Sequence, residues 1–433
     1  METNKNRWLI ALSAIAIHLS IGSVYAYSVY QNPLNETLGW AVSDVSLAFT
    51  VAIFFLGMSA AFLGFFVEKY GPRISGFVAA TLFGIGTLGA GWSIQLESLP
   101  MFIAFYGVIG GIGLGIGYIT PVSTLVKWFP DRRGLATGMA VMGFGAGALI
   151  TSPVAEFLMG AVNIPGTFYI LGAAYIIMML AGASYLKRPP EGWKPAAMIE
   201  KEKQEKEEGK NDSEEEKKEK KKEEPAGDLS QLKANEAIKT LRFYLLWLIM
   251  FINISAGIML LAVASSMTQE ITGSTAATAA TIVGIMGLFN GLGRIVWASA
   301  SDYLGRTNVF TIFFSIQVIA FFVLPLVTNV VIFGILLCII ISCYGGGFAC
   351  LPAYIGDLFG TKQLGAIHGY LLTAWAMAGI AGPTIVSSVV EATNSYAISF
   401  YIVNIMLIVA LVCAILLRFN VKKVRRQNET QAA

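Results

Sequence analysis

The sequence has little charge and lacks the residue patterns of enzymes and metal sites. Charged residues make up 13% of its 433 positions and hydrophobic residues 55%, whereas a soluble domain is about 25% charged. This composition excludes an ordinary soluble protein, and a net charge of +3 is no signature of nucleic-acid binding. The sequence shows no nucleophile constellation, metal-ligand cluster or phosphate-binding loop. We therefore expect no enzyme activity and no cofactor.

Cysteine is also scarce, with four residues in the chain. Their spacing matches neither a disulfide framework nor a zinc site. All four lie in apolar stretches, so we expect buried free thiols. They are Cys338, Cys343, Cys350 and Cys413.

Long apolar segments dominate the rest of the chain. A membrane-spanning helix needs about 20 mostly apolar residues, and twelve segments of this kind are present. Their residues do not alternate in polarity, which favours helices over a β-barrel. The predicted fold class is an all-α membrane protein with twelve transmembrane helices. The expected helices cover 8–30, 44–66, 75–95, 100–126, 134–160, 165–186, 240–267, 276–300, 307–327, 330–354, 364–389 and 395–418.

Lysine and arginine are missing from every second connection between these helices. The affected connections lie near 31–43, 93–99, 161–165, 268–275, 328–330 and 390–394. Basic residues collect on the cytoplasmic side of membrane proteins. The pattern therefore predicts a multi-pass protein of the cell (plasma) membrane with both termini in the cytoplasm. The first apolar run lacks a clear cleavage site, so we interpret it as an uncleaved helix rather than a signal peptide.

A charged segment divides the twelve helices into six and six. Nearly every residue between Glu200 and Glu224 is Glu or Lys, which predicts a solvated cytoplasmic linker over 187–239. The linker separates an N-terminal six-helix half (1–186) from a C-terminal six-helix half (240–418), and a cytoplasmic tail (419–433) follows.

The two halves carry matching motifs. GFFVEKYG at 64–71 follows the second expected helix, and ASASDYLGR at 298–306 follows the eighth. Glu68 and Asp302 in these motifs are 234 positions apart, and four glycine or proline pairs recur at offsets of 230 or 231. Five matches in register indicate an internal duplication, so the halves are expected to be pseudo-symmetric. Duplicated halves with a binding site between them at mid-membrane are typical of transporters.

These motifs resemble the signature of the major facilitator superfamily. Three longer stretches are similar to the oxalate/formate antiporter family, which is related to the monocarboxylate transporters: GSVYAYSVYQNPL at 22–34, the glycine-rich segment 110–148, and FNGLGRIVWASASDYLGR at 289–306. The resemblance covers both halves. It implies the major facilitator fold, alternating-access transport and a monomeric protein.

Arg294 is the one basic residue near the middle of an expected helix. It lies eight positions before Asp302, or about 12 Å along the helix, which is near the centre of a hydrocarbon layer about 30 Å thick. Asn290, one turn earlier, can hydrogen-bond to Arg294 but cannot neutralise it. An arginine fork matches a carboxylate, so we expect Arg294 to hold a carboxylate substrate. The alternative is a structural arginine that donates to helix carbonyls. The resemblance implies the substrate role.

Trp375 marks a departure from the family pattern. The resemblance implies that a lysine of the eleventh helix helps the arginine to hold the dianion oxalate, and LLTAWAMAGIAGP at 371–383 is similar to that helix with Trp375 at the lysine position. No Lys or Arg occurs from 363 to 417. A single cation suits a monoanion of the formate, lactate or pyruvate type. Trp375 would form a pocket wall with one N–H donor, and helix packing is its alternative role.

Four tyrosines are further candidates for the substrate cavity. A tyrosine provides an apolar wall and one hydroxyl, which suits a small organic acid. The resemblance implies that helices one, four and ten line the cavity. The candidates are Tyr25, Tyr27, Tyr118 and Tyr344, and helix packing is the alternative for each.

Other polar residues are candidates for proton binding or gating. His18 lies near mid-membrane and can carry a proton near neutral pH, although a neutral, hydrogen-bonded role between helices is the alternative. Glu156 lies toward the outer end of the fifth helix as a second candidate. Charged residues of the cytoplasmic loops are expected to lock one face of the transporter. These loop residues are Glu68, Lys69, Arg73, Arg132, Arg133, Asp302 and Arg306.

The sequence thus predicts a secondary carrier of small organic anions, working as an antiporter or with a proton as coupling ion. Its partners would be a small carboxylate and the lipid bilayer. Two alternatives remain open at this point. One is a carrier of the same fold for uncharged substrates or drugs, and the other is a non-transporting membrane sensor that signals through the charged linker.

Overall fold

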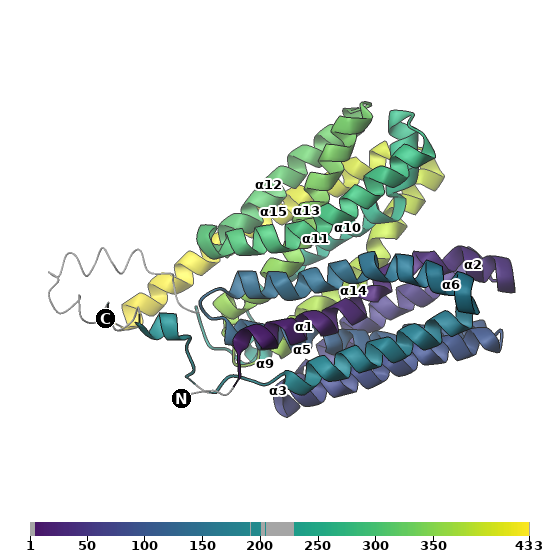
Figure 1. The fold of residues 1–433 in the computed structure, drawn as a ribbon. Coiled ribbons are helices and arrows are strands. Elements are labelled where there is room, and N and C mark those ends of the chain that lie inside the picture. Colours follow the sequence, from purple (N-terminus) through teal and green to yellow (C-terminus); the bar gives the residue numbers. More distant parts are fainter. Residues whose placement is uncertain (1–4, 191, 201–203, 205–228, 433) are drawn as a thin grey trace.

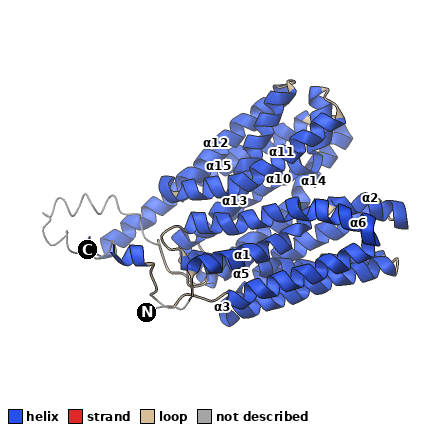
Figure 2. Ribbon diagram, viewed as in Figure 1, coloured by secondary structure: helices blue, strands red, loops and turns tan. Residues whose placement is uncertain are grey.

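The described part of the chain is built from helices and the turns between them. The computed structural model describes residues 5–190, 192–200, 204 and 229–432. Within these residues, Figure 2 shows helices and loops and no strand. Most of the Glu- and Lys-rich stretch predicted as a solvated linker, residues 201–203 and 205–228, lies outside the described residues.

The first half contains helices α1 to α6. Their bounds are α1 Arg7–Ile21, the 3₁₀ segment η1 Gly22–Ala26, α2 Ser28–Leu38, α3 Val42–Gln95, α4 Leu99–Phe102, the π-helical segment η2 Ile103–Gly110, α5 Gly111–Trp128 and α6 Arg133–Tyr185.

The second half follows a short helix at the end of the linker. Its bounds are α9 Ala234–Ala237, α10 Leu241–Thr272, α11 Ala276–Leu304, α12 Arg306–Val323, the 3₁₀ segment η3 Leu324–Leu326, α13 Val330–Phe359, α14 Leu364–Thr393 and α15 Ala397–Ala432.

Two of the long helices contain two membrane spans each. Ten helical stretches of the described chain are long and apolar enough to cross a membrane. Helix α3 has 54 residues and breaks at Gly71, and α6 has 53 residues and breaks at Asn163. An unbroken helix of this many residues would be about 80 Å long at 1.5 Å per residue, more than twice the hydrocarbon thickness. Counting α3 and α6 twice gives twelve spans in the described chain, which confirms the predicted fold class.

The first span differs from the expected single helix over 8–30. Helix α1 ends at Ile21, and a 3₁₀ segment, Gly22–Ala26, leads into α2. At the start of this segment two backbones approach closely, because a Cβ at residue 22 would overlap the main chain of Phe144 on α6.

Helix ends also differ from the expected ones elsewhere. Helix α10 continues to Thr272, and α15 runs through the expected tail to Ala432. The four cysteines are free and buried, as predicted from their apolar surroundings.

The described ends of the linker are bound to the helix bundles. The Trp128 indole donates to the carbonyl of Lys187 at 2.6 Å. At the other end, the amide of Leu229 donates to the carbonyl of Asp357 at 2.7 Å, and that of Leu232 to Phe359 at 2.9 Å. We call this end of the molecule, where both termini also lie (Figure 1), the linker end, and the opposite end the far end.

The two halves meet at the linker end and separate toward the far end. Figure 1 shows the bundle of the first half and that of the second half diverging away from the termini. The glycines of α11 also indicate that the space beside this helix widens toward the far end. Cβ atoms at positions 284, 287 and 291 would meet nothing within 4 Å. Near the linker end, by contrast, a Cβ at Gly134 of α6 would overlap Ala298 of α11.

Candidate functional site

Arg294 is fully buried between the two halves. Its Nη1 donates to the carbonyl of Val141 on α6 at 2.9 Å, and its Nε donates to Asn290 Oδ1 at 3.3 Å. Gly145 leaves space beside the guanidinium, since a Cβ there would lie 3.6 Å from Nε. Neither of its bonded acceptors is a carboxylate, so the positive charge of Arg294 is solvated by neutral groups.

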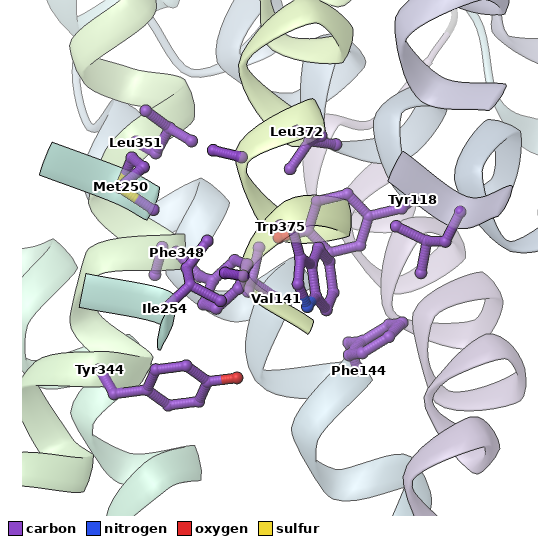
Figure 3. Packing of buried hydrophobic residues seen from close by; sticks show 14 of the residues in the cluster. Tyr118, Val141, Phe144, Met250, Ile254, Tyr344, Phe348, Leu351, Leu372 and Trp375 are labelled. Atoms are coloured by element: carbon purple, nitrogen blue, oxygen red, sulfur yellow. The ribbon is translucent and has the colours of Figure 1, made fainter. Parts of the chain in front are cut away.

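An aromatic cage surrounds the centre of the molecule beside Arg294. We define it by Tyr25, Tyr118, Phe144, Phe348 and Trp375, which come from η1, α5, α6, α13 and α14. The Trp375 ring lies 4.5 Å from Phe348, 5.4 Å from Tyr118, 5.8 Å from Phe144 and 6.4 Å from Tyr25, between ring centroids. Figure 3 shows Trp375 in the middle of this group. The cage therefore joins both halves.

The cage and Arg294 present four polar atoms without hydrogen-bond partners among the described residues. They are Arg294 Nη2, Trp375 Nε1 and the hydroxyl oxygens of Tyr25 and Tyr118. A buried unsatisfied polar group costs about 1–3 kcal/mol, so native structures keep few of them. All four can donate a hydrogen bond, and an ionised carboxylate only accepts them. The site is thus matched to an anion.

The Phe348 ring also faces the guanidinium directly. The Arg294 Cζ lies 5.6 Å from the centroid of the Phe348 ring, within the range of a cation–π contact. This contact and the apolar cage walls exclude water around the charge. Electrostatic attraction between Arg294 and an anion is stronger in such surroundings than in water.

Tyr344 lies at the edge of the cage. Its ring is 5.3 Å from Phe348, and Figure 3 shows its hydroxyl directed toward the Trp375 group. The Tyr344 and Tyr25 hydroxyls lie near enough to interact, although the Tyr25 hydroxyl forms no hydrogen bond of standard geometry with a described residue. Tyr25 itself is partly exposed, whereas Trp375 is 1% exposed. Tyr25 therefore lies on the open side of the cage.

Tyr27 lies elsewhere, in contrast to the prediction that it lines the cavity. Its hydroxyl donates to the carbonyl of Val45, and its ring packs 4.9 Å from Tyr106 and 5.7 Å from Phe49. This is a separate aromatic cluster inside the first half. Residues two positions apart on a helix do not share a face, so Tyr27 points away from the side on which Tyr25 lies.

His18 lies directly behind the cage wall. Its ring stacks on Tyr118 at 5.2 Å. Its Nδ1 is 2.8 Å from the carbonyl of Ala140, and its Nε2 is 3.1 Å from the carbonyl of Tyr118. A neutral His18 can donate its one N–H to either carbonyl, and only the protonated ring could donate to both, so the geometry is compatible with both roles that the sequence left open.

Glu156 lies apart from the residues around Arg294. It is exposed on the far part of the first span of α6, well away from the linker-end contacts. The structure therefore places Glu156 outside the group around Arg294.

At the linker end, Glu68 ties the two halves together. Its Oε1 accepts from the amide of Gly365, at the start of α14, at 2.8 Å. Its Oε2 forms an ion pair with Lys127 at 2.9 Å. A carboxylate at a helix N-terminus is favoured by the helix dipole, so the bond to α14 is a capping contact between halves.

Asp302 makes the corresponding contact in the opposite direction. Its two oxygens accept from the amides of Gly134 and Leu135, at the start of α6, at 2.9 and 3.0 Å. Arg306 pairs with Asp302, and Arg133 pairs with Asp357 at 3.0 Å. These contacts close the linker end.

The remaining loop residues take no part in this closure. Lys69, Arg73 and Arg132 are exposed. Lys69 and Arg73 lie over the rings of Tyr70 and Phe77, their own neighbours in sequence. These three residues therefore carry their charges on the surface of the protein.

Three residues of the site were missed from the sequence. Val141 contributes only its carbonyl, and nothing in its side chain signals that role. Phe144 sits in a glycine-rich helix without polar neighbours. Phe348 lies four positions after Tyr344 on α13, and this helical spacing could have placed it on the same face.

The site contains no arrangement for a metal ion. No group of three or more His, Cys, Asp or Glu side chains within the described ranges is positioned to hold one.

Comparison with known families gives one match that spans the chain. The model of the Major Facilitator Superfamily matches residues 11–349 and 246–433. Two solved structures have the same fold. The proton:xylose symporter XylE has a TM-score of 0.69 at 16% identity, covering 94% of both chains. FucP in the outward conformation has a TM-score of 0.66 at 13% identity, covering 93% of this chain and 98% of FucP.

Curated relatives are similar over most of the length. The oxalate:formate antiporter of Oxalobacter formigenes is 28% identical over 382 residues, covering 87% of this chain and 83% of the relative. The uncharacterized MFS-type transporter YhjX of Escherichia coli (strain K12) is 24% identical over 381 residues, covering 87% and 86%. Human monocarboxylate transporter 10 is 23% identical over 417 residues, covering 92% and 75%.

Proposed function

The chain belongs to the major facilitator superfamily of membrane transporters, and on this basis we propose that it carries small monocarboxylates across the membrane by alternating access. Arg294 would hold the carboxylate, and the aromatic cage would enclose the rest of the molecule. The carrier would work as an antiporter or with a proton as coupling ion. The relatives named as an oxalate:formate antiporter and a monocarboxylate transporter support this class of substrate.

One observation carries the proposal: the buried Arg294 and the aromatic cage beside it hold four donors without partners. Arg294 Nη2, Trp375 Nε1 and the hydroxyls of Tyr25 and Tyr118 lack acceptors among the described residues. A carboxylate brings two oxygens that accept several hydrogen bonds. It would satisfy these donors and neutralise Arg294 in one step. An uncharged substrate would leave the arginine charge without compensation.

The single positive charge of the proposed site supports a monoanion over a dianion as the substrate. Trp375 and Arg294 would line the same site, and Trp375 has no charge. No Lys or Arg occurs from 363 to 417, the region that includes all of α14. A dianion would leave one negative charge buried and unpaired, which is strongly unfavourable. Formate, lactate and pyruvate fit the charge of the site better than oxalate.

The closed and open ends of the structure support alternating access. We take residues 1–186 and 240–418 as the two moving halves and the linker end as the cytoplasmic side, which follows the distribution of Lys and Arg. The contacts of Glu68 and Asp302 then lock the cytoplasmic side. The diverging far ends correspond to an outward-facing carrier. Rocking of the halves would break the lock and expose Arg294 to the cytoplasm.

A counterflow experiment tests the substrate class. Purified protein in liposomes preloaded with formate, lactate, pyruvate, acetate or oxalate would be assayed for uptake of the same labelled compound, at equal concentrations. We expect counterflow with at least one monocarboxylate and weaker counterflow with oxalate. A clear preference for oxalate would refute the argument from a single cation, and counterflow with none of the five compounds would refute the carboxylate site itself.

A further inference from the structure

A groove between α12 and α15 lies outside the carboxylate site, at the linker end of the second half. Its volume is about 440 Å³, and its walls include Asn308, Ile312, Ser315 and Ile316 of α12 and Arg418 of α15. The α12 residues recur at spacings of three and four, so they share one face of the helix. We call this feature the α12–α15 groove.

The α12–α15 groove is continuous with the apolar outer surface of the second half. Ile312 on its wall is exposed, and Ile319 and Phe322, which continue the same stripe of α12, are more exposed still. On α15, Phe419 follows Arg418 directly and is also exposed. An extended exposed apolar surface marks the part of a protein that contacts the membrane. The groove therefore opens toward the lipid.

The groove begins at the membrane surface and extends into the hydrocarbon layer. Tyr303, at the end of α11, is 85% exposed, and tyrosine is enriched where a membrane meets water. Ile316 lies ten positions beyond the first residue of α12, or about 15 Å further along the helix. A ligand with a polar head at the surface and an apolar tail in the membrane fits this placement.

Arg418 brings a positive charge to the groove. It is exposed and forms no hydrogen bond or ion pair with a described residue. Lys422, Arg425 and Arg426 follow it at helical spacing, and no Asp or Glu occurs from 418 to 428. Lys and Arg clustered directly on the cytoplasmic side of a membrane span attract anionic lipid headgroups, and the arginine fork matches a phosphate. The groove thus combines an apolar wall with an uncompensated cation.

The acidic residue nearby in the sequence does not supply the missing counter-charge. Leu304 of α11 also lines the groove, and Asp302 precedes it by two positions. Asp302 is already bound to Arg306 and to the amides of Gly134 and Leu135. A negative charge for Arg418 must therefore come from outside the described chain.

The charged end of α15 is held against the second half. Val421 is buried, and Asn428 donates to the carbonyl of Leu229 at 3.0 Å. Figure 1 shows this end of α15 projecting beyond the bundle at the linker end. The cations are thus presented along one ordered helix that continues from the groove.

We propose that the α12–α15 groove binds an anionic phospholipid of the cytoplasmic leaflet, with the phosphate on Arg418 and an acyl chain along Ile312 and Ile316. This inference uses the membrane setting and the cytoplasmic position of the linker end, and it is independent of the carboxylate site. Helices α11, α12 and α15 belong to the same half, so rocking of the halves leaves the groove intact. The lipid stays bound throughout the cycle and braces the second half.

Lipid titration of the purified protein, followed by native mass spectrometry, tests this site. The probes are phosphatidylglycerol and phosphatidylcholine with identical acyl chains, and inorganic phosphate serves as the soluble anion. We expect the native protein to bind the first phosphatidylglycerol at least about fivefold more tightly than phosphatidylcholine. Arg418→Gln should lose this preference and keep its affinity for phosphatidylcholine.

Two further variants separate the groove from general surface charge. Arg73→Gln removes the same charge from an exposed position of the first half and should keep the preference. Ser315→Phe fills the groove without changing charge and should weaken phosphatidylglycerol binding. The melting temperature of each variant in phosphatidylcholine alone shows whether it is folded.

Three results would overturn the lipid site. The first is equal affinity of the native protein for the two lipids. The second is an equal loss of preference in Arg73→Gln and Arg418→Gln, which would indicate unspecific attraction by surface charge. The third is displacement of phosphatidylglycerol by inorganic phosphate at equal concentration, because the ligand would then be a free anion. None of these results affects the proposed carboxylate transport, which counterflow tests separately.

Discussion

Glu68 and Asp302 hold equivalent positions in the two halves, and each caps a helix of the opposite half. Glu68 accepts from the amide of Gly365 on α14, and Asp302 accepts from that of Gly134 on α6, at 2.8 and 2.9 Å. The internal duplication thus becomes a pair of reciprocal locks at one end of the molecule. Each lock consists of a carboxylate and a helix N-terminus, which a rocking motion can separate without unfolding either half.

Removing either carboxylate should weaken this closure. Loss of a capping carboxylate costs about 0.5–2 kcal/mol, so we expect Glu68→Gln and Asp302→Asn each to raise the population open at the linker end several-fold. Ser123→Cys, introduced at this buried seam in a chain whose four native cysteines are replaced, would report the opening by its rate of maleimide labelling. Glu156→Gln, on the exposed far part of α6, is the control. Equal labelling rates in all variants would contradict the lock.

Replacing Arg294 should abolish substrate binding. Hydrogen bonds to charged groups contribute about 1.5–3 kcal/mol each, so loss of two predicts at least a 100-fold lower affinity in Arg294→Gln. Arg294→Lys keeps the charge without the planar fork, and we expect an intermediate affinity. Binding and counterflow of a monocarboxylate are the measurements. Arg73→Gln, an exposed arginine on α3, should behave as the native protein. Undiminished counterflow in Arg294→Gln would refute the site.

Adding a second cation at Trp375 should change the charge preference. We expect Trp375→Lys to raise the ratio of oxalate to formate transport by about tenfold or more, because a second positive charge compensates the second carboxylate. Trp375→Phe removes the N–H donor but adds no charge. It should lower the affinity for both anions without changing their ratio. A ratio that is the same in Trp375→Lys and the native protein would show that residue 375 does not face the substrate.

Tyr25 and Tyr27 form a matched pair with opposite expected effects. Tyr27→Phe breaks the bond to the Val45 carbonyl, so it should lower stability by about 1 kcal/mol and leave affinity unchanged. Tyr25→Phe removes a hydroxyl without a protein partner. It should leave thermal stability unchanged and weaken carboxylate binding by about 2- to 10-fold, or ~0.5–1.5 kcal/mol. Thermal denaturation in detergent and counterflow distinguish the two. The reverse pattern would mean that Tyr27 is the cavity residue.

Much of the fold could be predicted because it depends on properties read along the chain. Segment length and apolarity predicted the spans, and the depth of Arg294 followed from its distance to Asp302. The close approach of α6 to Gly22, where the first helix ends, could not be predicted, because it joins residues far apart in the sequence. The different directions of Tyr25 and Tyr27 could have been predicted, because residues two positions apart on a helix do not share a face.

Residues of the site were harder to predict where they contribute a backbone group or an apolar side chain. The partner of Arg294 on α6 is the carbonyl of Val141, which any residue could provide.

The sequence by itself determined the class of the molecule, a membrane protein with two six-helix halves, and it predicted one charge near the membrane centre. These features follow from composition, spacing and repetition, which do not depend on contacts. Only the tertiary structure decided which side chains meet around that charge and which end of the molecule is closed. The physical reason is that a cavity between two halves is lined by residues far apart in sequence. A small rotation of one helix changes which of its residues face the opposite half.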